Sequence, residues 1–344
     1  MNERFVIQGI GGIGGVIAGM MRAAELRPVL VTNNEDITHA INDHGIQVST
    51  PSEKHTTSRQ AFTTLPEAAA HGLFDAAFLV MKATGVVEAA VEAARYLNPG
   101  GYVVTFQNGI VEDAVGHAIG IERVVSASIG WNAVMHAPGV YERTTPGDTF
   151  IGELDGSTSP RVRAIADALR HAGPVKISTN MRGVLWSKLA INCTINSVGA
   201  LTGETLGEML GDARIRRLFL LAYSEVVDTA EAQNVRLERI AANPKLLYLP
   251  KDAGPITRYA KDVIARMLGR KYKHARASTL QSLERGRKTE VDFLNGYVVD
   301  AARKLSIPTP VNAALTIMIK EIEGGTRKIA QSNIDDLLQM ISEA

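Results

Sequence analysis

The chain has 344 residues, more than a single hydrophobic core usually organises, and this length is typical of two domains. Its hydrophobic (45%) and charged (21%) fractions are those of an ordinary globular protein. The formal net charge of +1 argues against a global field that would recruit nucleic acid or an acidic membrane surface. Cys193 is the single cysteine, which excludes an intramolecular disulfide and a thiolate metal cluster.

The apolar stretch 5–21 is the one segment of the sequence that could be mistaken for a secretion signal or a membrane span. It is dense in glycine, which favours a turn over a continuous helix, and no small-residue cleavage site follows it. We therefore expect a cytoplasmic protein without a metal, a nucleic-acid partner or a membrane partner.

Short apolar runs alternate with helical patterns in the first half of the chain. We expect strands at 4–8, 28–32, 74–81, 102–106 and 124–129, and helices at 14–26, 36–44, 86–97 and 160–171. The segment Asn98-Pro99-Gly100-Gly101 should stop the helix at 86–97. Such alternation predicts a Rossmann-like, doubly wound α/β sheet. Residues 130–154, rich in Gly, Thr and Val, predict short and partly antiparallel strands at its edge.

Helical spacing dominates from about Met181 onward. We expect helices at 185–195, 204–210, 213–234, 277–305 and 312–322. The prediction is a dinucleotide-binding domain at 1–179 and an all-α substrate and catalytic domain at 180–344. The long helices of the second domain offer a surface on which a homodimer could form.

The segment Gly9-Ile10-Gly11-Gly12-Ile13-Gly14 follows the first predicted strand and opens the first predicted helix. In this context the G-x-G-x-x-G spacing indicates a dinucleotide-binding turn. The first glycine permits the tight turn, the second lets the backbone approach a pyrophosphate, and the third lets the helix pack against the strand. Free N–H groups and the dipole at the helix N-terminus favour phosphate. A glycine-rich loop without a ligand is the alternative, against which strand, turn and helix agree.

The second predicted strand ends at Thr32-Asn33-Asn34, where an NAD-specific site usually has an acid that accepts from the ribose 2′-hydroxyl. Here Glu35 and Asp36 follow only later. Because Asn33 or Asn34 could donate to a 2′-phosphate, we expect NADP(H), with NAD(H) as the alternative. The asparagines could instead serve only the turn and the cap of the next helix.

Lys188, Asn192 and Asn196 are spaced by four residues in an otherwise apolar segment, so they stack on one helical face. Isolated buried polar groups are costly, which favours a stripe facing a cleft. A solvated face or an internal hydrogen-bond ladder is the alternative. A partly buried lysine can protonate the alkoxide that forms when a ketone is reduced.

Two further candidates follow predicted strands. Lys82 ends the strand at 74–81, and Asn108 follows the strand at 102–106. Ligands of open parallel sheets bind beyond the carboxyl ends of the strands. The alternatives are an ordinary strand-end lysine and a plain Asn-Gly turn. Later in the chain, Ser278 could cap a helix and Glu290 could be a surface residue of the helix at 277–305.

Taken in order, these motifs resemble the ketopantoate reductase (2-dehydropantoate 2-reductase) family over essentially the whole chain. The marks are the glycine turn, Lys82, Gln107-Asn108-Gly109, the segment 185–189 with Asn192 and Asn196, and Ser278 with the block 289–296. Five motifs in the right order are more specific than any one of them.

The resemblance implies a Rossmann domain followed by a helical domain, and the NADPH-dependent reduction of 2-dehydropantoate to pantoate, a step toward pantothenate and coenzyme A. It implies that Lys188 is the catalytic proton donor and that Glu290 is the acidic residue that positions the substrate. The remaining implied roles are substrate binding by Asn192, Asn196 and Ser278, and cofactor or substrate contact by Lys82 and Asn108.

The chain also departs from the family pattern. Asn33 stands where the family often has a basic residue, and Gly85 where it often has glutamine. The segment 235–276 is longer and basic, which indicates either a solvated helix or a lid that would change the substrate. Two alternatives therefore remain: a D-2-hydroxy-acid dehydrogenase of the same family with a bulkier 2-oxo acid, and a dinucleotide-binding protein without turnover.

Overall fold

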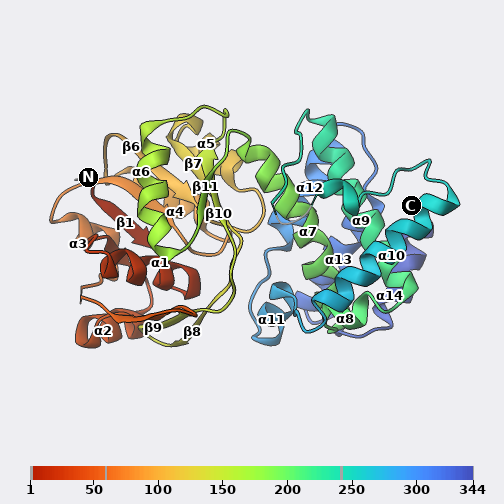
Figure 1. The fold of residues 1–344 in the computed structure, drawn as a ribbon, viewed down its shortest axis with the longest axis horizontal. Coiled ribbons are helices and arrows are strands. Elements are labelled where there is room, and N and C mark those ends of the chain that lie inside the picture. The colour runs from red at the N-terminus through yellow and green to blue at the C-terminus, as the bar shows by residue number, and fades with distance from the viewer. Residues whose placement is uncertain (1–2, 59, 241–242, 344) are drawn as a thin grey trace. The chain divides into compact units, whose positions relative to one another are not determined.

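The computed structural model describes residues 3–58, 60–240 and 243–343. The chain forms two compact units, which are coloured from red to green and from green to blue in Figure 1. The first unit comprises residues 1–107 and 111–181, and the second comprises residues 108–110 and 182–344. No helix among the described residues has the length and hydropathy needed to cross a lipid bilayer.

A seven-stranded sheet organises the first unit, with the order β11-β10-β7-β6-β5-β1-β2. Its strands are β1 (Phe5–Gln8), β2 (Val29–Val31), β5 (Phe74–Leu79), β6 (Leu97–Thr105), β7 (Val124–Ile129), β10 (Thr149–Glu153) and β11 (Val175–Ile177). Neighbouring strands are parallel, except that β10 is antiparallel to β7. The predicted α/β architecture is thus confirmed, and the ends of β1, β2, β5 and β6 share the edge at which such sheets bind ligands.

The helices of this unit are α1 (Gly12–Ala23), α2 (Glu35–His44), α3 (Leu65–Ala69), α4 (Val86–Ala94), α5 (Glu112–Ile119) and α6 (Pro160–Leu169), with 3-10 turns η1 (Ile121–Arg123) and η2 (Arg170–Ala172). Helices α1, α2, α4 and α6 lie close to the predicted positions, whereas α3 and α5 were not predicted. One boundary is wrong: α4 ends at Ala94, and the Asn98-Pro99-Gly100-Gly101 segment lies within β6. The register of β5 and β6 shifts between Phe74 and Ala76, and this irregularity accommodates the turn-like residues in the strand.

A second sheet of four strands, in the order β4-β3-β9-β8, was not predicted as a separate sheet. Its strands are β3 (Gln47–Ser49), β4 (Lys54–Thr56), β8 (Ala133–Ala137) and β9 (Val140–Arg143). The sequence placed β8 and β9 at the edge of the main sheet, and that expectation is wrong. Instead β9 pairs with β3, which is only three residues long and shows no readable alternation, and β8 pairs with β9.

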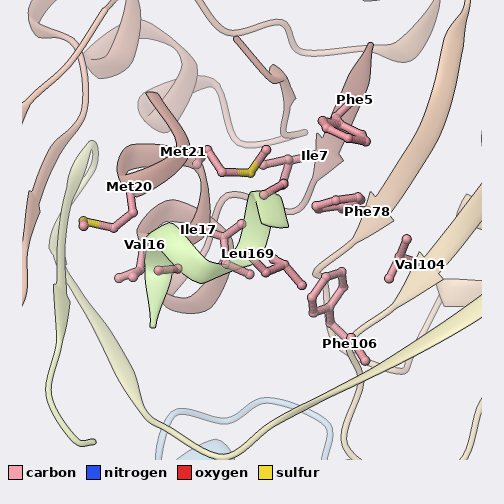
Figure 2. Packing of buried hydrophobic residues seen from close by; sticks show 14 of the residues in the cluster. Phe5, Ile7, Val16, Ile17, Met20, Met21, Phe78, Val104, Phe106 and Leu169 are labelled. Atoms are coloured by element: carbon pink, nitrogen blue, oxygen red, sulfur yellow. The ribbon is translucent and has the colours of Figure 1, made fainter. Parts of the chain in front are cut away.

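The main core of the first unit lies between helix α1 and the large sheet, as Figure 2 shows. Phe78 lies between Phe5 and Phe106, with ring centroids 5.2 and 5.5 Å away. Val16 and Ile17 of α1 are fully buried in the same cluster. This packing holds the beginning of α1 against the end of β1, because both belong to one rigid core.

The second unit has helices and 3-10 turns and no strand among its described residues, so its all-α class is as predicted. Its helices are α7 (Met181–Thr202), α8 (Leu206–Met209), α9 (Ala213–Ala232), α10 (Pro255–Lys271), α11 (Ser278–Glu284), α12 (Asn295–Arg303), α13 (Pro310–Glu323) and α14 (Asn333–Ser342), with 3-10 turns η3 (Pro244–Leu246) and η4 (Val291–Phe293). The predicted single helix at 277–305 is wrong. It breaks after Glu284, where Gly286 takes a φ of +61°, and resumes only at Asn295.

Candidate active site

The glycine turn joins β1 to α1 in a geometry that suits a dinucleotide. Gly9 has a φ of +93°, and a Cβ atom there would lie 2.7 Å from the backbone nitrogen of Met81. Its N–H donates to the carbonyl oxygen of Val31, 3.0 Å away on β2. A side chain at this position would be strained as well as obstructed, so glycine is required.

Gly11 and Gly14 have different roles in this turn. A Cβ on Gly11, the residue before α1, would meet nothing within 4 Å, so the backbone there is open to an approaching group. A Cβ on Gly14 would overlap the carbonyl oxygen of Gly9, so this glycine lets the helix approach the strand. The cradle therefore fits a pyrophosphate at the N-terminus of α1. Ile10 is buried, so only its backbone atoms can face a ligand there, and Ile13 is half-buried and packs against the core.

Tyr141 on β9 braces this turn, and the sequence reading missed it. Its hydroxyl donates to the carbonyl oxygen of Ile10 at 3.1 Å, and its ring lies against Gly15. Burial raises the pKa of the Tyr141 hydroxyl, which stays protonated and remains a donor. The backbone carbonyl of Ala133 on β8 would lie 2.8 Å from a Cβ on Gly12. The glycines of α1 thus serve the small sheet as well as a ligand.

The β2–α2 turn separates the roles of the two asparagines. The side chain of Asn34 accepts from the N–H of Ile37 at 3.1 Å and caps α2, which is the alternative that the sequence left open. Asn33 is exposed and remains the candidate for contact with the ribose. Glu35 and Asp36 occupy the first turn of α2, and both are exposed.

Gln107 supports the segment that carries Lys82. Its side-chain nitrogen donates to the carbonyl oxygens of Leu79 and Met81, at 2.7 and 2.9 Å. Lys82 follows directly and is exposed. Gln107 itself is buried, so its function is to hold the end of β5 in place. Asn108, which follows it, is half-buried and belongs to the second unit.

Helix α7 carries the predicted polar stripe without interruption. Lys188 and Asn192 are half-buried, and Asn196 is 8% exposed. The amide nitrogen of Asn192 is buried and makes no hydrogen bond to any described residue. A buried donor without an acceptor is costly unless a ligand supplies one. The middle of the stripe is therefore shaped for an acceptor that the chain does not provide.

Ser278 and Asn196 lie together, although 82 residues separate them. The Asn196 side-chain oxygen accepts from the N–H of Ser278 at 3.1 Å and from its hydroxyl at 3.2 Å. Ser278 is exposed and is the first residue of α11, so the expectation that it caps the helix is wrong, because Ala277 occupies the cap. Glu290 is half-buried and precedes η4 in the break between α11 and α12, outside the helix expected for it.

A buried polar network holds α7 from behind, and the sequence reading missed this network too. Asn295 donates to the carbonyl oxygen of Cys193 at 3.0 Å and to the side-chain oxygen of Asn312 at 2.9 Å, and it accepts from Ser197 at 2.5 Å. Both asparagines are fully buried. Because every link is a specific hydrogen bond, the network fixes the rotation of α7 and hence the direction of its stripe.

Glu225 of α9 completes the network. Its carboxylate accepts from the backbone N–H groups of Val311 and Asn312, each at 2.9 Å, and from the Asn312 amide at 2.6 Å. Burial raises the pKa of Glu225 to about 7, against the opposing effect of the Asn312 and Val311 hydrogen bonds. The polar residues at 225, 295 and 312 stand in apolar helical patterns, which is the signal that could have revealed them.

The comparison with family sequences covers most of the chain. Residues 5–156 match the family described as "Ketopantoate reductase PanE/ApbA", and residues 180–323 match "Ketopantoate reductase PanE/ApbA C terminal". The 2-dehydropantoate 2-reductase of Pyrococcus abyssi is 29% identical over 325 residues, which are 92% of this chain and 97% of that protein.

Solved structures share the fold over the same length. A PanE/ApbA family ketopantoate reductase from Ralstonia eutropha has a TM-score of 0.78 at 24% identity and covers 94% of this chain and 100% of its own. A D-mandelate dehydrogenase solved with NADH and anilino(oxo)acetate has a TM-score of 0.76 at 18% identity and covers 94% of this chain and 98% of its own. At these identities the two structures support the fold alone.

Proposed function

The chain belongs to the ketopantoate reductase PanE/ApbA family, as its motifs predicted, and from this premise we propose that it reduces 2-dehydropantoate to pantoate with NADPH. Membership makes it a nicotinamide-dependent oxidoreductase that acts on a CH–OH group. We also propose a cytoplasmic location and the domain limits 1–179 and 180–344, on the sequence arguments given above.

The observation that carries the proposal is the polar stripe of α7. A half-buried Lys188 lies one helical turn from the buried, unsatisfied amide of Asn192, and Asn196 follows with Ser278 bound to it. In our proposal Lys188 donates the proton to the ketone oxygen. Asn192, Asn196 and Ser278 bind the substrate, with Ser278 near its carboxylate. Glu290 positions the substrate. Such a set gives a 2-oxo acid both charge-assisted and neutral hydrogen bonds.

The turn at residues 9–14 would hold the dinucleotide, which supplies a hydride when bound. The open backbone at Gly11 and the N-terminus of α1 accept the pyrophosphate, while Asn33 lies where the ribose is expected. Lys82 and Asn108 are proposed to contact cofactor or substrate. NADPH is proposed from the lack of an acid at residues 32–34, and NADH is the alternative.

A panel of 2-oxo acids tests this proposal. The purified chain is assayed at 340 nm with NADPH and with NADH, against 2-dehydropantoate and against 2-oxo acids with larger aliphatic and aromatic side chains. We expect the highest kcat/KM with 2-dehydropantoate and NADPH. Oxidation of neither cofactor with any 2-oxo acid, despite measurable cofactor binding, would mean a dinucleotide-binding protein without turnover.

The proton donor is tested separately. Lys188→Ala should lower kcat by roughly two to four orders of magnitude, the range for a positioned general acid. Lys176→Ala is the matched control, because Lys176 is an exposed lysine that pairs with Asp148 at 2.6 Å. Both variants should keep the thermal stability of the parent. Near-parental turnover in Lys188→Ala would remove that residue from the mechanism.

The second candidate is a D-2-hydroxy-acid dehydrogenase with a bulkier substrate. The observation that favours it is the fold shared with a D-mandelate dehydrogenase, together with a segment at 235–276 that is long for the family. In that case the panel should rank an aromatic or branched 2-oxo acid above 2-dehydropantoate, with the same dependence on Lys188.

A further inference from the structure

Glu290 lies where the chain returns to the interior of the second unit. Residues 284–288 before it are all exposed, and Gly286 among them takes a φ of +61°. Thr289 is only 8% exposed, and Val291 is fully buried. Because no side chain of residues 284–288 is buried, the position of Glu290 depends on how the chain is held from Thr289 onward.

The C-terminal end of α13 holds the chain just before Glu290. The carboxylate of Glu323, the last residue of α13, accepts from the backbone N–H of Thr289 at 2.5 Å. That N–H has no other acceptor among the described residues. The hydroxyl oxygen of Thr289 accepts in turn from the N–H of Val291 at 3.2 Å. The carboxylate of Glu323 thus fixes the residue before Glu290, and the hydroxyl of that residue holds the residue after it.

A second contact from α13 holds the chain just after Glu290. Lys320, three residues before Glu323, pairs with Asp292 at 2.5 Å. Their side chains are 50% and 60% exposed, so this ion pair contributes little to stability. The carbonyl oxygen of Glu290 itself accepts from the N–H groups three and four residues later, at 3.0 and 3.1 Å. The end of one helix therefore holds the backbone on both sides of Glu290.

The location of Glu323 is unfavourable for α13 itself. The negative end of the helix dipole lies at the last turn, where a cation stabilises a helix and a carboxylate does not. Glu323 is exposed, so burial does not account for an acid there. Its bond to the N–H of the buried Thr289 does, because an ionised acceptor binds an N–H group more strongly than a neutral one.

We propose that Glu323 is a positioning residue for Glu290, with a lesser contribution from Lys320. The proposal rests on the function proposed above, in which Glu290 positions the 2-oxo acid. A side chain can position a substrate only if its own backbone is held, because a displacement of about 1 Å can cost a hundredfold in rate. Glu323 acts through the chain at 289–292 and needs no contact of its own with the substrate.

Steady-state kinetics of the full chain, with NADPH and the best 2-oxo acid of the panel, test the proposal. Glu323→Ala should lower kcat/KM for the 2-oxo acid about tenfold and leave KM for NADPH unchanged. Glu323→Gln should stay within about threefold of the parent, because its side-chain oxygen still accepts from Thr289. Lys320→Met should cost about twofold. The control is Asp300→Ala on α12, an exposed carboxylate that pairs with Arg303 at 3.0 Å, and it should match the parent.

A double-mutant cycle separates positioning from a general loss of stability. Glu290→Gln alone should lower kcat/KM about tenfold or more. In that background Glu323→Ala should cost less than about twofold, because both changes remove the same function. A merely structural role of Glu323 predicts the full tenfold loss in both backgrounds, and that result overturns the proposal. Thermal melting establishes that each variant is folded.

Hydrogen exchange measured by mass spectrometry tests the contact without turnover. The amides of residues 289–294 should exchange about fivefold faster in Glu323→Ala than in the parent, and at the parental rate in Glu323→Gln. Parental exchange in Glu323→Ala overturns the proposal. So does parental turnover in that variant when Glu290→Gln is impaired, and this outcome leaves the proposed function intact. Parental turnover in Glu290→Gln instead removes Glu290 from the proposed function, and the role of Glu323 falls with it.

Discussion

Raising the pH from 5 to 8 should destabilise the second unit through Glu225. Burial raises the pKa of this carboxyl in the folded chain from 4.5 to about 7. A raised folded-state pKa means that the protonated form stabilises the fold. That stability is fully present below about pH 4.5 and is lost as the pH rises through about 7. At about 1.4 kcal/mol for each pKa unit, between 2 and 3 kcal/mol is lost over this range.

Glu225→Gln isolates the effect, because the amide occupies the same space and does not titrate. This variant is expected to be less stable than the parent at pH 5, since its NH2 group cannot accept from the N–H groups at the start of α13. Its free energy of unfolding should nevertheless change less between pH 5 and pH 8, by the 2 to 3 kcal/mol attributed to Glu225.

The measurement follows chemical denaturation by tryptophan fluorescence at pH 5, 6, 7 and 8. A Trp131→Phe background leaves Trp186, which is buried in the second unit, as the reporter. Glu284→Gln is the control, because that carboxylate is exposed and pairs with Arg276 at the surface. If the parent and Glu225→Gln lose equal stability between pH 5 and 8, the reasoning about Glu225 is refuted.

Four further variants test the first unit. Gly11→Ala should lower dinucleotide affinity at least about tenfold and leave the melting temperature unchanged. Gly14→Ala should lower both the affinity and the melting temperature, because its methyl group would overlap a backbone carbonyl. Equal melting temperatures in the two variants would contradict this. Tyr141→Phe should raise the dissociation constant for NADPH about threefold to tenfold, because the carbonyl oxygen of Ile10 loses its hydrogen bond to the Tyr141 hydroxyl. Calorimetric titration measures this constant, and an unchanged value would show that the hydrogen bond does not support the dinucleotide-binding turn. Gln107→Leu should lower kcat/KM about tenfold or more, because the carbonyl groups of Leu79 and Met81 before Lys82 lose their hydrogen-bond donor. Steady-state kinetics that match the parent would show that the end of β5 keeps its position without Gln107.

Much of the first unit follows from local sequence. Alternating apolar runs and helical patterns specify parallel strands with crossovers, because each element buries a face with its own period. The glycines at 9, 11 and 14 are readable for the same reason, since turn, open approach and close packing involve residues adjacent in the chain. The stripe from Lys188 to Asn196 is likewise a property of one helix.

Only the tertiary structure reveals the small sheet and the brace from Tyr141 to Ile10. A three-residue strand has almost no pattern of its own, and β3 becomes a strand only because β9, about 90 residues later, pairs with it. Periodicity also runs through the break between α11 and α12, because the loop residues there are partly buried and mimic a helix face.

In the candidate site, the sequence determines which residues α7 carries, whereas the tertiary structure determines how they are oriented. The polar residues of α7 are close together in the sequence, so their chemistry could be inferred from the sequence alone. Their orientation depends on Asn295, Asn312 and Glu225, which come from three other helices. Hydrogen bonds between residues 86 to 102 positions apart leave no periodic trace in the chain, and only the folded structure decides them.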